Sequence, residues 1–317
     1  PDKRKVSSRY LFYSLLNREF INTVNNSTFG SKMPRANWNF IGNQIIPFPT
    51  INQQNEITSE LDLQTRLIDQ IIEKKKILID LLKEKRTAII NHAVTKGLDP
   101  NAQMVDSGID WIGKVPEGWR VMPFKYCVEF QEGPGIMASD FRDSGTSLLR
   151  VRNLTPGEVS LSNCNFLDPQ KVNTVWRHFL LKEGDLLISA SATMGIVSEV
   201  GKNAEGAIAY TGIIRLTSNE EKTDKNFIKF FVISKPYNSQ IDVLHSGTAM
   251  QHYGPTHLKK VTGFFPPVNI QIKIGNYLVL QSKEYDDAIK KVEGSIKLLN
   301  EFKMSLISNA VTGKIKI

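Results

Sequence analysis

Two long stretches of the chain, residues 54–93 and about 270–311, carry apolar residues at the spacing of a helix, and the segment between them does not. The first stretch contains neither proline nor glycine. Apolar residues that recur every three or four positions form one continuous face of a helix. The pattern predicts two long amphipathic helices, each spanning about 60 Å for ~40 residues.

The apolar faces of these helices have the heptad character of a coiled coil, in which each helix shields the other from water. In the first helix the expected packing positions are Leu61, Ile68, Ile71, Leu78, Leu82 and Ile89. In the second helix they are Leu278, Tyr285, Val292, Leu299 and Leu306. The long intervening segment allows an antiparallel pair. The alternative is that the helices pack on a separate core or on another copy of the chain.

The segment between the helices is predicted to fold as a mixed α/β domain. Short apolar runs bounded by turn formers indicate β-strands. The predicted strands cover 147–152, 185–189, 195–200, 207–210 and 213–216. Residues 225–244 have a helical apolar face that Pro236 is expected to interrupt or kink. The expected fold class is α+β, with two long antiparallel coiled-coil helices.

A constant shift of 217 residues aligns the start of the chain with its end, without insertion or deletion. Matching segments include Phe48-Pro49 with Phe265-Pro266, Gln54 with Gln271, and Ala93-Val94-Thr95 with Ala310-Val311-Thr312. Such self-similarity indicates a duplicated structural unit. Residues 1–97 repeat as roughly 218–314, whereas about 105–217 has no counterpart near the start of the chain.

Composition narrows the class of protein. The 317 residues carry a net charge of +8, which favours a polyanionic partner such as nucleic acid. No apolar run approaches the ~18 residues of a membrane span, and none follows the first residues as in a signal peptide. Cys127 and Cys164 have no metal-binding spacing and form no disulfide framework. We expect a cytoplasmic protein that binds no metal.

The sequence contains no recognisable motif of an enzyme that modifies or cleaves DNA. Pro266-Pro267 is followed by Val268 rather than by the aromatic residue of an amino-methylation motif. Gly133-Pro134-Gly135 is too short for a phosphate-binding loop. The histidines have no metal-binding spacing; they are His92, His178, His245, His252 and His257. We therefore expect no catalytic centre.

Several segments, in their order along the chain, resemble the specificity (S) subunits of type I restriction–modification enzymes. The connector 106–119, the strand end at 152–154 and the run 182–187 look like the opening half of a target recognition domain. Residues 246–248, 265–267 and 310–313 look like its closing half with the helix that follows. The resemblance covers essentially the whole chain.

The resemblance implies a non-catalytic subunit that recognises a split target in double-stranded DNA. Two target recognition domains would each contact one half of the target, and the long helices would fix the length of the unread spacer. Two modification subunits would dock on this scaffold and bring S-adenosylmethionine. Restriction subunits would join through the complex and bring ATP. No cofactor is then expected on this chain itself.

The resemblance divides the chain into four parts. Residues 1–52 match the C-terminal part of a first target recognition domain, and 53–97 form the first spacer helix. Residues 98–266 form a second, complete target recognition domain, and 267–317 form the second spacer helix and a tail. The first domain lacks its opening half, so its contact with DNA depends on whether another chain or a second copy supplies that half.

Candidate DNA contacts are residues that can donate to phosphates or base edges. Arg150, Arg152 and Asn153 stand on and just after a predicted strand, with both arginines on one face. A small polar loop follows the 185–189 strand and can approach phosphate through its backbone N–H groups. Its candidate residues are Ser189, Ser191, Thr193 and Met194. The alternatives are a solvated strand face and a plain turn.

The resemblance places two further loops at the DNA. Loop 246–254 combines hydroxyl, amide, imidazole and phenol groups, and its candidates are Gly247, Thr248, Met250, Gln251, His252 and Tyr253. The matching loop of the first repeat has the candidates Gly30, Ser31, Lys32 and Arg35. Gln54 and Gln271 stand at equivalent helix starts, where they are expected to cap the helix or fix it to its domain.

Two other classes of function stay open at this stage. A stand-alone DNA-binding regulator or coiled-coil scaffold would share the charge and the helices but would need no modification subunit. A DNA-modifying enzyme is a third class, which the missing motifs oppose.

Overall fold

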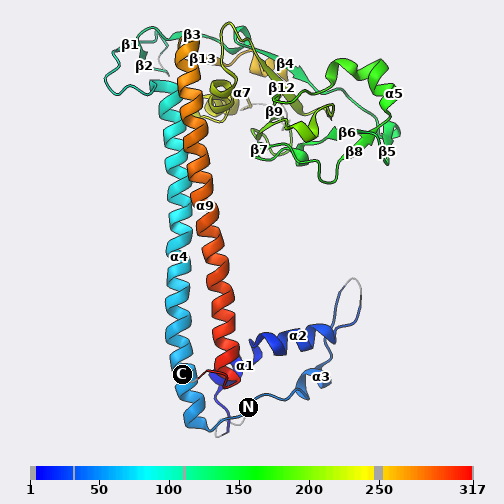
Figure 1. Cartoon of the computed structure of the whole chain (residues 1–317), viewed down its shortest axis with the longest axis vertical. Helices are drawn as coiled ribbons and strands as arrows, with labels where there is room; N and C mark the ends of the chain where they lie inside the picture. Colours follow the sequence, from blue (N-terminus) through cyan, green and yellow to red (C-terminus); the bar gives the residue numbers. More distant parts are fainter. Residues whose placement is uncertain (1–4, 31–32, 110–111, 246–252, 316–317) are drawn as a thin grey trace. The chain divides into compact units, whose positions relative to one another are not determined.

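The computed structural model describes residues 5–30, 33–109, 112–245 and 253–315, and Figure 1 shows its helices and strands. The chain forms two compact units. Unit 1 comprises residues 1–84 and 285–317, and unit 2 comprises residues 85–284. The two long helices, α4 (Ile51–Lys96) and α9 (Val268–Val311), each contribute to both units, and their ends lie within three residues of the predicted ones.

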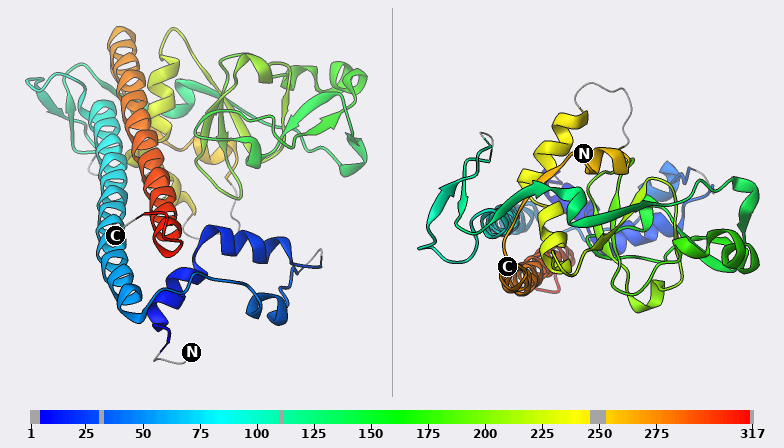
Figure 2. Two further views of the ribbon diagram at one scale, coloured as in Figure 1. Left: turned by 60° about the horizontal axis from the view of Figure 1, so that its bottom comes forward. Right: turned by 90° about the horizontal axis from the view of Figure 1, so that it is seen from above.

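Unit 1 consists of helices in the part of it that the structure describes. They are α1 (Ser8–Leu15), α2 (Arg18–Asn26), α3 (Trp38–Gly42) and the adjoining parts of α4 and α9; Figure 2 shows the three short ones, in blue, from two further sides. Tyr10 lies at the centre of the core, and its hydroxyl donates to the carbonyl oxygens of Val311 at 3.2 Å and Pro47 at 3.1 Å. Leu61 of α4 and Ile307 of α9 share this core.

The α4 and α9 segments of unit 1 run antiparallel, as the sequence predicts. Leu61 shares a core with Ile307, and further along α4 the carboxylate of Asp69 accepts a hydrogen bond from Lys303 Nζ at 2.7 Å. Position therefore rises along α4 as it falls along α9. The mutual burial of one face of each helix is what an amphipathic pair requires in water.

The buried row of α4 differs in part from the predicted one. Leu61 and Ile68 are buried as predicted, and Leu82 and Ile89 are half-buried. The prediction is wrong for Ile71 and Leu78, because these side chains are 45% and 43% exposed. The row that faces inward advances alternately by four and three positions, through Leu61, Thr65, Ile68, Ile72, Lys75 and Ile79, of which Lys75 is half-buried and the others are buried. Because two of these positions hold the polar residues Thr65 and Lys75, the apolar pattern alone does not indicate which residues of α4 face inward.

The predicted packing positions of α9 agree better with the observed burial than those of α4 do. Leu278 is fully buried, and the other four are half-buried along the same side; they are Tyr285, Val292, Leu299 and Leu306. Ile289 and Ile307, which the prediction omitted, are more completely buried. The row of α9 residues that packs against α4, here called the seam, is thus on the expected side of the helix. Ile289 and Ile307, next to the predicted positions, lie deepest in it within unit 1.

Unit 2 contains two mixed sheets. The larger has the strand order β4-β12-β9-β10-β7, antiparallel except between β10 and β7. Its strands are β4 (Val128–Glu132), β12 (Ile213–Ser218), β9 (Leu186–Ser189), β10 (Val197–Glu199) and β7 (Gly157–Glu158). The smaller has the order β11-β6-β8-β5, from β11 (Ile208–Ala209), β6 (Thr146–Leu149), β8 (Asn165–Leu167) and β5 (Phe141–Arg142).

Helices and two short ribbons complete unit 2. The helices are α5 (Pro169–Lys171), α6 (Lys225–Val232), α7 (Lys235–His245) and α8 (Pro255–Leu258). The ribbons pair β1 (Met104–Asp106) with β2 (Lys114–Pro116) and β3 (Arg120–Pro123) with β13 (Thr262–Phe265). The single predicted helix 225–244 is therefore two helices. The interruption expected at Pro236 is confirmed: Pro236 lies in the first turn of α7, where no intrahelical N–H is needed, so a new helix begins there and no helix is kinked.

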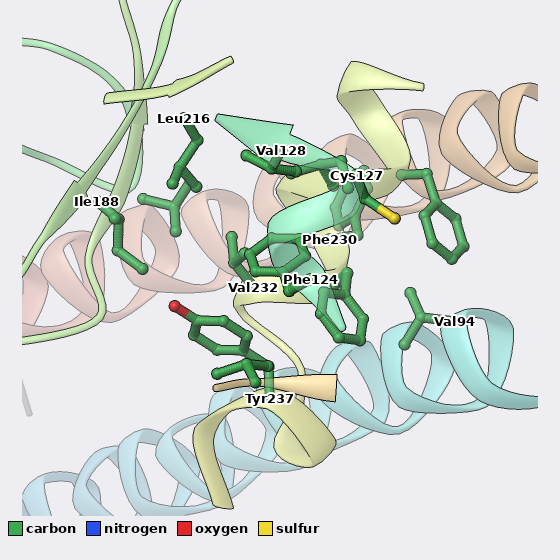
Figure 3. Packing of buried hydrophobic residues seen from close by; sticks show 14 of the residues in the cluster. Val94, Phe124, Cys127, Val128, Ile188, Leu216, Phe230, Val232 and Tyr237 are labelled. Carbon is green, nitrogen blue, oxygen red and sulfur yellow. The ribbon is translucent and has the colours of Figure 1, made fainter. Parts of the chain in front are cut away.

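One core joins the helices of unit 2 to its larger sheet. Val94 points from α4 toward Phe124, and Cys127, Val128, Phe230 and others close around them, as Figure 3 shows. Aromatic rings dominate this core: Phe124 lies 5.4 Å from Phe231 between ring centroids. The two halves of the domain thus share one core, because Phe124 precedes the larger sheet and Phe230 and Phe231 follow it.

Helices of the two units begin at positions that differ by the same 217 residues. The starts of α1, α2, α3 and α4 correspond in this way to those of α6, α7, α8 and α9. Strand β13 has no such equivalent. Residues 45–48, at the matching positions of unit 1, form no strand, and Ile45 is 96% exposed. In unit 2 that strand pairs with β3, which belongs to the opening half of the domain.

Substitution of Ile72 tests the corrected seam. We expect Ile72→Ala to lower the free energy of unfolding by about 2–4 kcal/mol, because it opens a cavity between packed helices. Ile71→Ala, one residue away and exposed, is the matched control and should change it by less than about 0.5 kcal/mol. Urea denaturation of the full chain measures both. Equal losses, or a larger loss in Ile71→Ala, would contradict the assignment of Ile72 rather than Ile71 to the interface between the helices.

Candidate nucleic-acid interface

The hairpin between β9 and β10 is built around the side chain of Ser189. Its hydroxyl donates to the carbonyl oxygen of Thr193 at 2.6 Å and accepts from the N–H of Ile196 at 2.8 Å. Ala192 and Gly195 adopt the left-handed conformation, with φ of 55° and 81°. A residue other than glycine in this region carries strain, which persists only when its surroundings hold it. The hairpin tip therefore has one defined shape.

Tyr253 fixes the end of loop 246–254 to this hairpin. Its N–H donates to the carbonyl oxygen of Ala190 at 3.0 Å, and its hydroxyl donates to that of Ser189 at 2.8 Å. Burial raises the pKa of Tyr253 well above its ordinary value. The described end of loop 246–254 thus lies against the β9–β10 hairpin.

Two of the predicted DNA contacts are supports of this surface instead. Ser189 is fully buried and Tyr253 is 1% exposed, and both hydroxyl groups are engaged within the protein. The prediction for them is corrected, because a buried hydroxyl without a free donor cannot reach DNA. Ser191, Thr193 and Met194 do lie at the accessible tip, and their contact with DNA stays a prediction.

The arginine cluster also differs from the prediction. The strand β6 ends at Leu149, and residues 151–153 form a 3₁₀ turn, so Arg150 and Arg152 do not share a strand face. Asn153 is 1% exposed; its Nδ2 donates to the carbonyl oxygens of Ser160 and Ser162, both at 3.0 Å. Its amide has no donor left for a base edge, so its role is to fold the turn.

Arg150 and Arg152 keep access to solvent. The guanidinium of Arg150 lies 5.3 Å from the ring centroid of Tyr210, and Arg152 donates to the carbonyl oxygen of Asn163 at 2.7 Å. Stacking on an aromatic ring holds a guanidinium in place while leaving donors free. Both arginines remain candidates for phosphate contact.

The turn 210–212 connects Arg150 with the hairpin tip, and sequence reasoning missed it. A Cβ atom at Gly212 would lie 2.2 Å from Ser191 Oγ, so only glycine fits. The N–H of Gly212 donates to Glu132 Oε1 at 3.2 Å, and Thr211 Oγ1 lies at the same distance from that oxygen. The Thr211-Gly212 pair between two predicted strands was the available signal. Arg150, Tyr210 and the tip thus belong to one neighbourhood.

The remaining candidates fall in two groups. Gly247, Thr248, Met250, Gln251 and His252, together with Ser31 and Lys32, lie outside the described residues. In unit 1 the backbones of Phe29 and Arg35 pair across the loop, with the N–H of Arg35 donating to the carbonyl oxygen of Phe29 at 2.9 Å. Gly30 has a φ of 100° within that closed loop, and Arg35 is exposed. Their contact with DNA stays a prediction.

Metal chemistry and membrane insertion find no support among the residues that the structure describes. They contain no cluster of three or more histidine, cysteine, aspartate or glutamate side chains placed to hold a metal ion. None of their helices is both long and apolar enough to cross a membrane.

An ion triad ties the larger sheet to helix α6. Glu199 of β10 accepts hydrogen bonds from Lys225 Nζ at 2.7 Å and Lys229 Nζ at 3.0 Å. Burial acts to raise the pKa of Glu199, but the hydrogen bonds and charges of the two lysines outweigh burial and hold the pKa below its ordinary value of 4.5. The triad therefore favours the charged carboxylate in the folded protein.

Acid should remove the contribution of this triad. Because the folded-state pKa of Glu199 is depressed, its stabilisation is present above the unfolded pKa near 4.5 and is lost as pH falls through the folded value. Glu199→Gln should therefore be less stable than the wild type at about pH 7, and the difference should shrink below about pH 4. Urea unfolding across this range measures it. A difference independent of pH would contradict the account.

Ser189→Ala tests the support of the hairpin. We expect a loss of about 1–3 kcal/mol in stability, because the buried N–H of Ile196 loses its partner. Thr193→Ala, at the accessible tip, is the control and should leave stability within about 0.5 kcal/mol of the wild type. Thermal unfolding followed by circular dichroism distinguishes them. If Ser189→Ala is as stable as the control, the hydroxyl does not organise the hairpin.

Comparison with known proteins gives the same family of relatives by sequence and by structure. No family model matches the sequence. The type I restriction enzyme MjaVIII specificity subunit of Methanocaldococcus jannaschii is 26% identical over 97% of this chain and 70% of its own length. The EcoBI specificity subunit of Escherichia coli is 19% identical over 98% of this chain and 66% of its own length. The chain thus spans about two thirds of these relatives.

Solved structures share the fold. A chain from a study of complex assembly and conformational transition of a type I restriction–modification system matches 99% of this chain with a TM-score of 0.77 and 15% identity. The HsdS subunit of Thermoanaerobacter tengcongensis matches 99% with a TM-score of 0.55 and 16% identity. The resemblance predicted from the sequence is confirmed: the relatives of this chain are type I specificity subunits, and it has their fold.

Proposed function

We propose that this chain is the non-catalytic DNA-recognition subunit of a type I restriction–modification enzyme and acts in the cytoplasm on double-stranded DNA. The observation that carries the proposal is the likeness to type I specificity subunits over nearly the whole chain, in sequence and in fold. Its net charge of +8 suits a polyanionic partner. The domain of unit 2 contacts one half of a split target through the hairpin tip and the arginines beside it.

Recognition in this proposal depends on a rigid support beneath an accessible tip. Ser189 and Tyr253 hold the backbone of the β9–β10 hairpin, and Ser191, Thr193 and Met194 are left to face the DNA. Small polar side chains allow the backbone to approach phosphate, and the arginines add charge. Methyl transfer and cleavage belong to partner subunits, which bring S-adenosylmethionine and ATP.

The modification subunits dock, in this proposal, on the outer face of α4. Six apolar side chains of α4 in unit 1 are exposed and lie away from the seam: Leu63, Leu67, Ile71, Ile77, Leu78 and Leu81. Their spacing places them on one stripe of the helix. A contiguous exposed apolar stripe is typical of a protein interaction site. The incorrectly predicted seam residues Ile71 and Leu78 thus belong to this exposed stripe.

Co-purification tests the docking stripe. Leu67→Glu should leave the chain folded, because the side chain is exposed, and should reduce capture of the modification subunit at least about tenfold, as loss of a buried apolar anchor does. Val175→Glu, exposed in unit 2, is the control. The two subunits are co-expressed, one is captured, and the ratio of the subunits is measured. Undiminished capture by Leu67→Glu would exclude this stripe.

Target selection tests the function itself. The complex of this chain with its modification subunit is incubated with a randomised duplex library at a stated salt concentration, and bound DNA is sequenced. We expect one defined sequence element for the domain of unit 2, and a second element at fixed distance where unit 1 also contacts DNA. Binding by the chain alone, with no assembly, would favour a stand-alone regulator. Methyl transfer by the purified chain alone would contradict the non-catalytic role.

A further inference from the structure

Gln271 is a completely buried amide at the start of α9. Its Oε1 accepts from the N–H of Asp224 at 3.0 Å, and its Nε2 donates to the carbonyl oxygens of Lys222 at 2.9 Å and Pro266 at 2.8 Å. Asp224 is the N-cap residue of α6. Of the two roles expected from the sequence, the side chain therefore does not cap its own helix. It joins the helix to two backbone segments of the domain.

The three partners determine the orientation of the amide. One donor faces the oxygen and two acceptors face the nitrogen, so only a neutral amide satisfies all three groups. Glutamate would set a carboxylate against two carbonyl oxygens. Gln271 itself is fully buried, and a buried polar group left without a partner destabilises a fold by about 1–3 kcal/mol. Such a contact tolerates little change in the angle between α9 and the domain.

Gly275, one turn further along α9, brings the helix close to the same place. A Cβ atom there would lie 2.6 Å from Asp224 Oδ1 and 2.8 Å from the Cβ of Asn226. Glycine within a helix is less favourable than alanine by about 1 kcal/mol, and here the close approach explains it. Gly294, further along the same helix, has nothing within 4 Å of such a Cβ.

Gln54 makes the same contacts in unit 1. It is fully buried; its Oε1 accepts from the N–H of Ser7 at 2.8 Å, and its Nε2 donates to the carbonyl oxygens of Lys5 at 3.1 Å and Pro49 at 2.9 Å. Ser7 is the N-cap residue of α1. Every atom of this set lies 217 residues before its equivalent around Gln271. The arrangement therefore belongs to the repeated unit rather than to one accidental packing.

We propose that Gln271, assisted by Gly275, is a positioning residue that fixes the direction in which spacer helix α9 leaves the recognition domain, and that Gln54 does so for α4. A helix direction set at its root decides where the far end lies, and thereby the number of base pairs left unread between the two halves of the target. The link from helix direction to the number of unread base pairs rests on the proposed function. The effect of the amide on the direction of α9 does not depend on that function.

The mechanical effect is measured within unit 2. Spin labels are placed at the exposed positions Lys283 on α9 and Lys202 in the domain, in full-length chain with Cys127→Ala and Cys164→Ser, and their distance distribution is recorded. Gln271→Ala should broaden the distribution about twofold or shift its mean, because a hinge replaces a fixed junction. Gln281→Ala is the matched control, since Gln281 bonds only to Glu284 on the same exposed helix face.

A second variant guards against loss of folding. If Gln271→Ala does not fold, Gly275→Ala should shift the mean distance, because its Cβ must displace the domain, whereas Gly294→Ala should not. An unchanged distribution in folded Gln271→Ala, or an equal change in the Gln281→Ala control, overturns the proposal.

Target selection separates this inference from the proposed function. The assembled Gln271→Ala complex should accept spacers about one base pair longer and shorter than the wild type does, at ~3.4 Å per base pair. Its affinity for a duplex that carries only the half-site of unit 2 should be unchanged. A wild-type spacer preference retained by the variant overturns the positioning role alone. If the wild-type complex selects no target, the proposed function fails. The spin-label distances still test whether Gln271 fixes the direction of α9.

Discussion

The burial of one apolar face of each long helix is the interaction on which the rest of the molecule depends. Neither α4 nor α9 is apolar enough to be buried all round, and neither could keep its shape alone with that face in water. In unit 1 residues of both helices belong to the core around Tyr10, and in unit 2 other residues of both helices belong to the core around Phe124. Each globular part is thus attached to a helix by continuous packing and not by a flexible linker.

The candidate DNA surface follows from this attachment. In unit 2 the core that includes Val94 of α4 and Leu278 of α9 also includes Ile188 of β9, the strand that leads into the hairpin. Ser189 and Tyr253 then define the tip, and Gln271 joins the root of α9 to the cap of α6. A chain of buried contacts therefore connects the helix to the hairpin that carries the candidate DNA contacts. Rigid support beneath a small accessible tip is what precise placement on DNA requires.

The sequence predicts the long-range plan of this fold better than its local chemistry. The helices, their ends, the five strand runs and the mixed α/β class are recoverable because hydrophobic periodicity is a strong signal over many residues. The positions of α4 that face the seam are not recoverable, since Thr65 is buried and Lys75 is half-buried where a heptad pattern expects apolar residues. Polar loop residues are harder still. Ser189, Asn153 and Tyr253 resemble DNA contacts in composition, and only burial and bonded partners identify them as supports.

Exchange of the recognition domain tests the central claim most directly. Residues 104–265 are replaced by the corresponding segment of the Methanocaldococcus jannaschii relative, the hybrid is assembled with the modification subunit of this system, and its DNA target is determined by selection and sequencing. The account predicts normal assembly and a change in only one part of the target. The element that unit 2 recognises is replaced by one characteristic of the donor, and the rest of the target is unchanged. An unchanged target would show that sequence recognition resides elsewhere and would contradict the account.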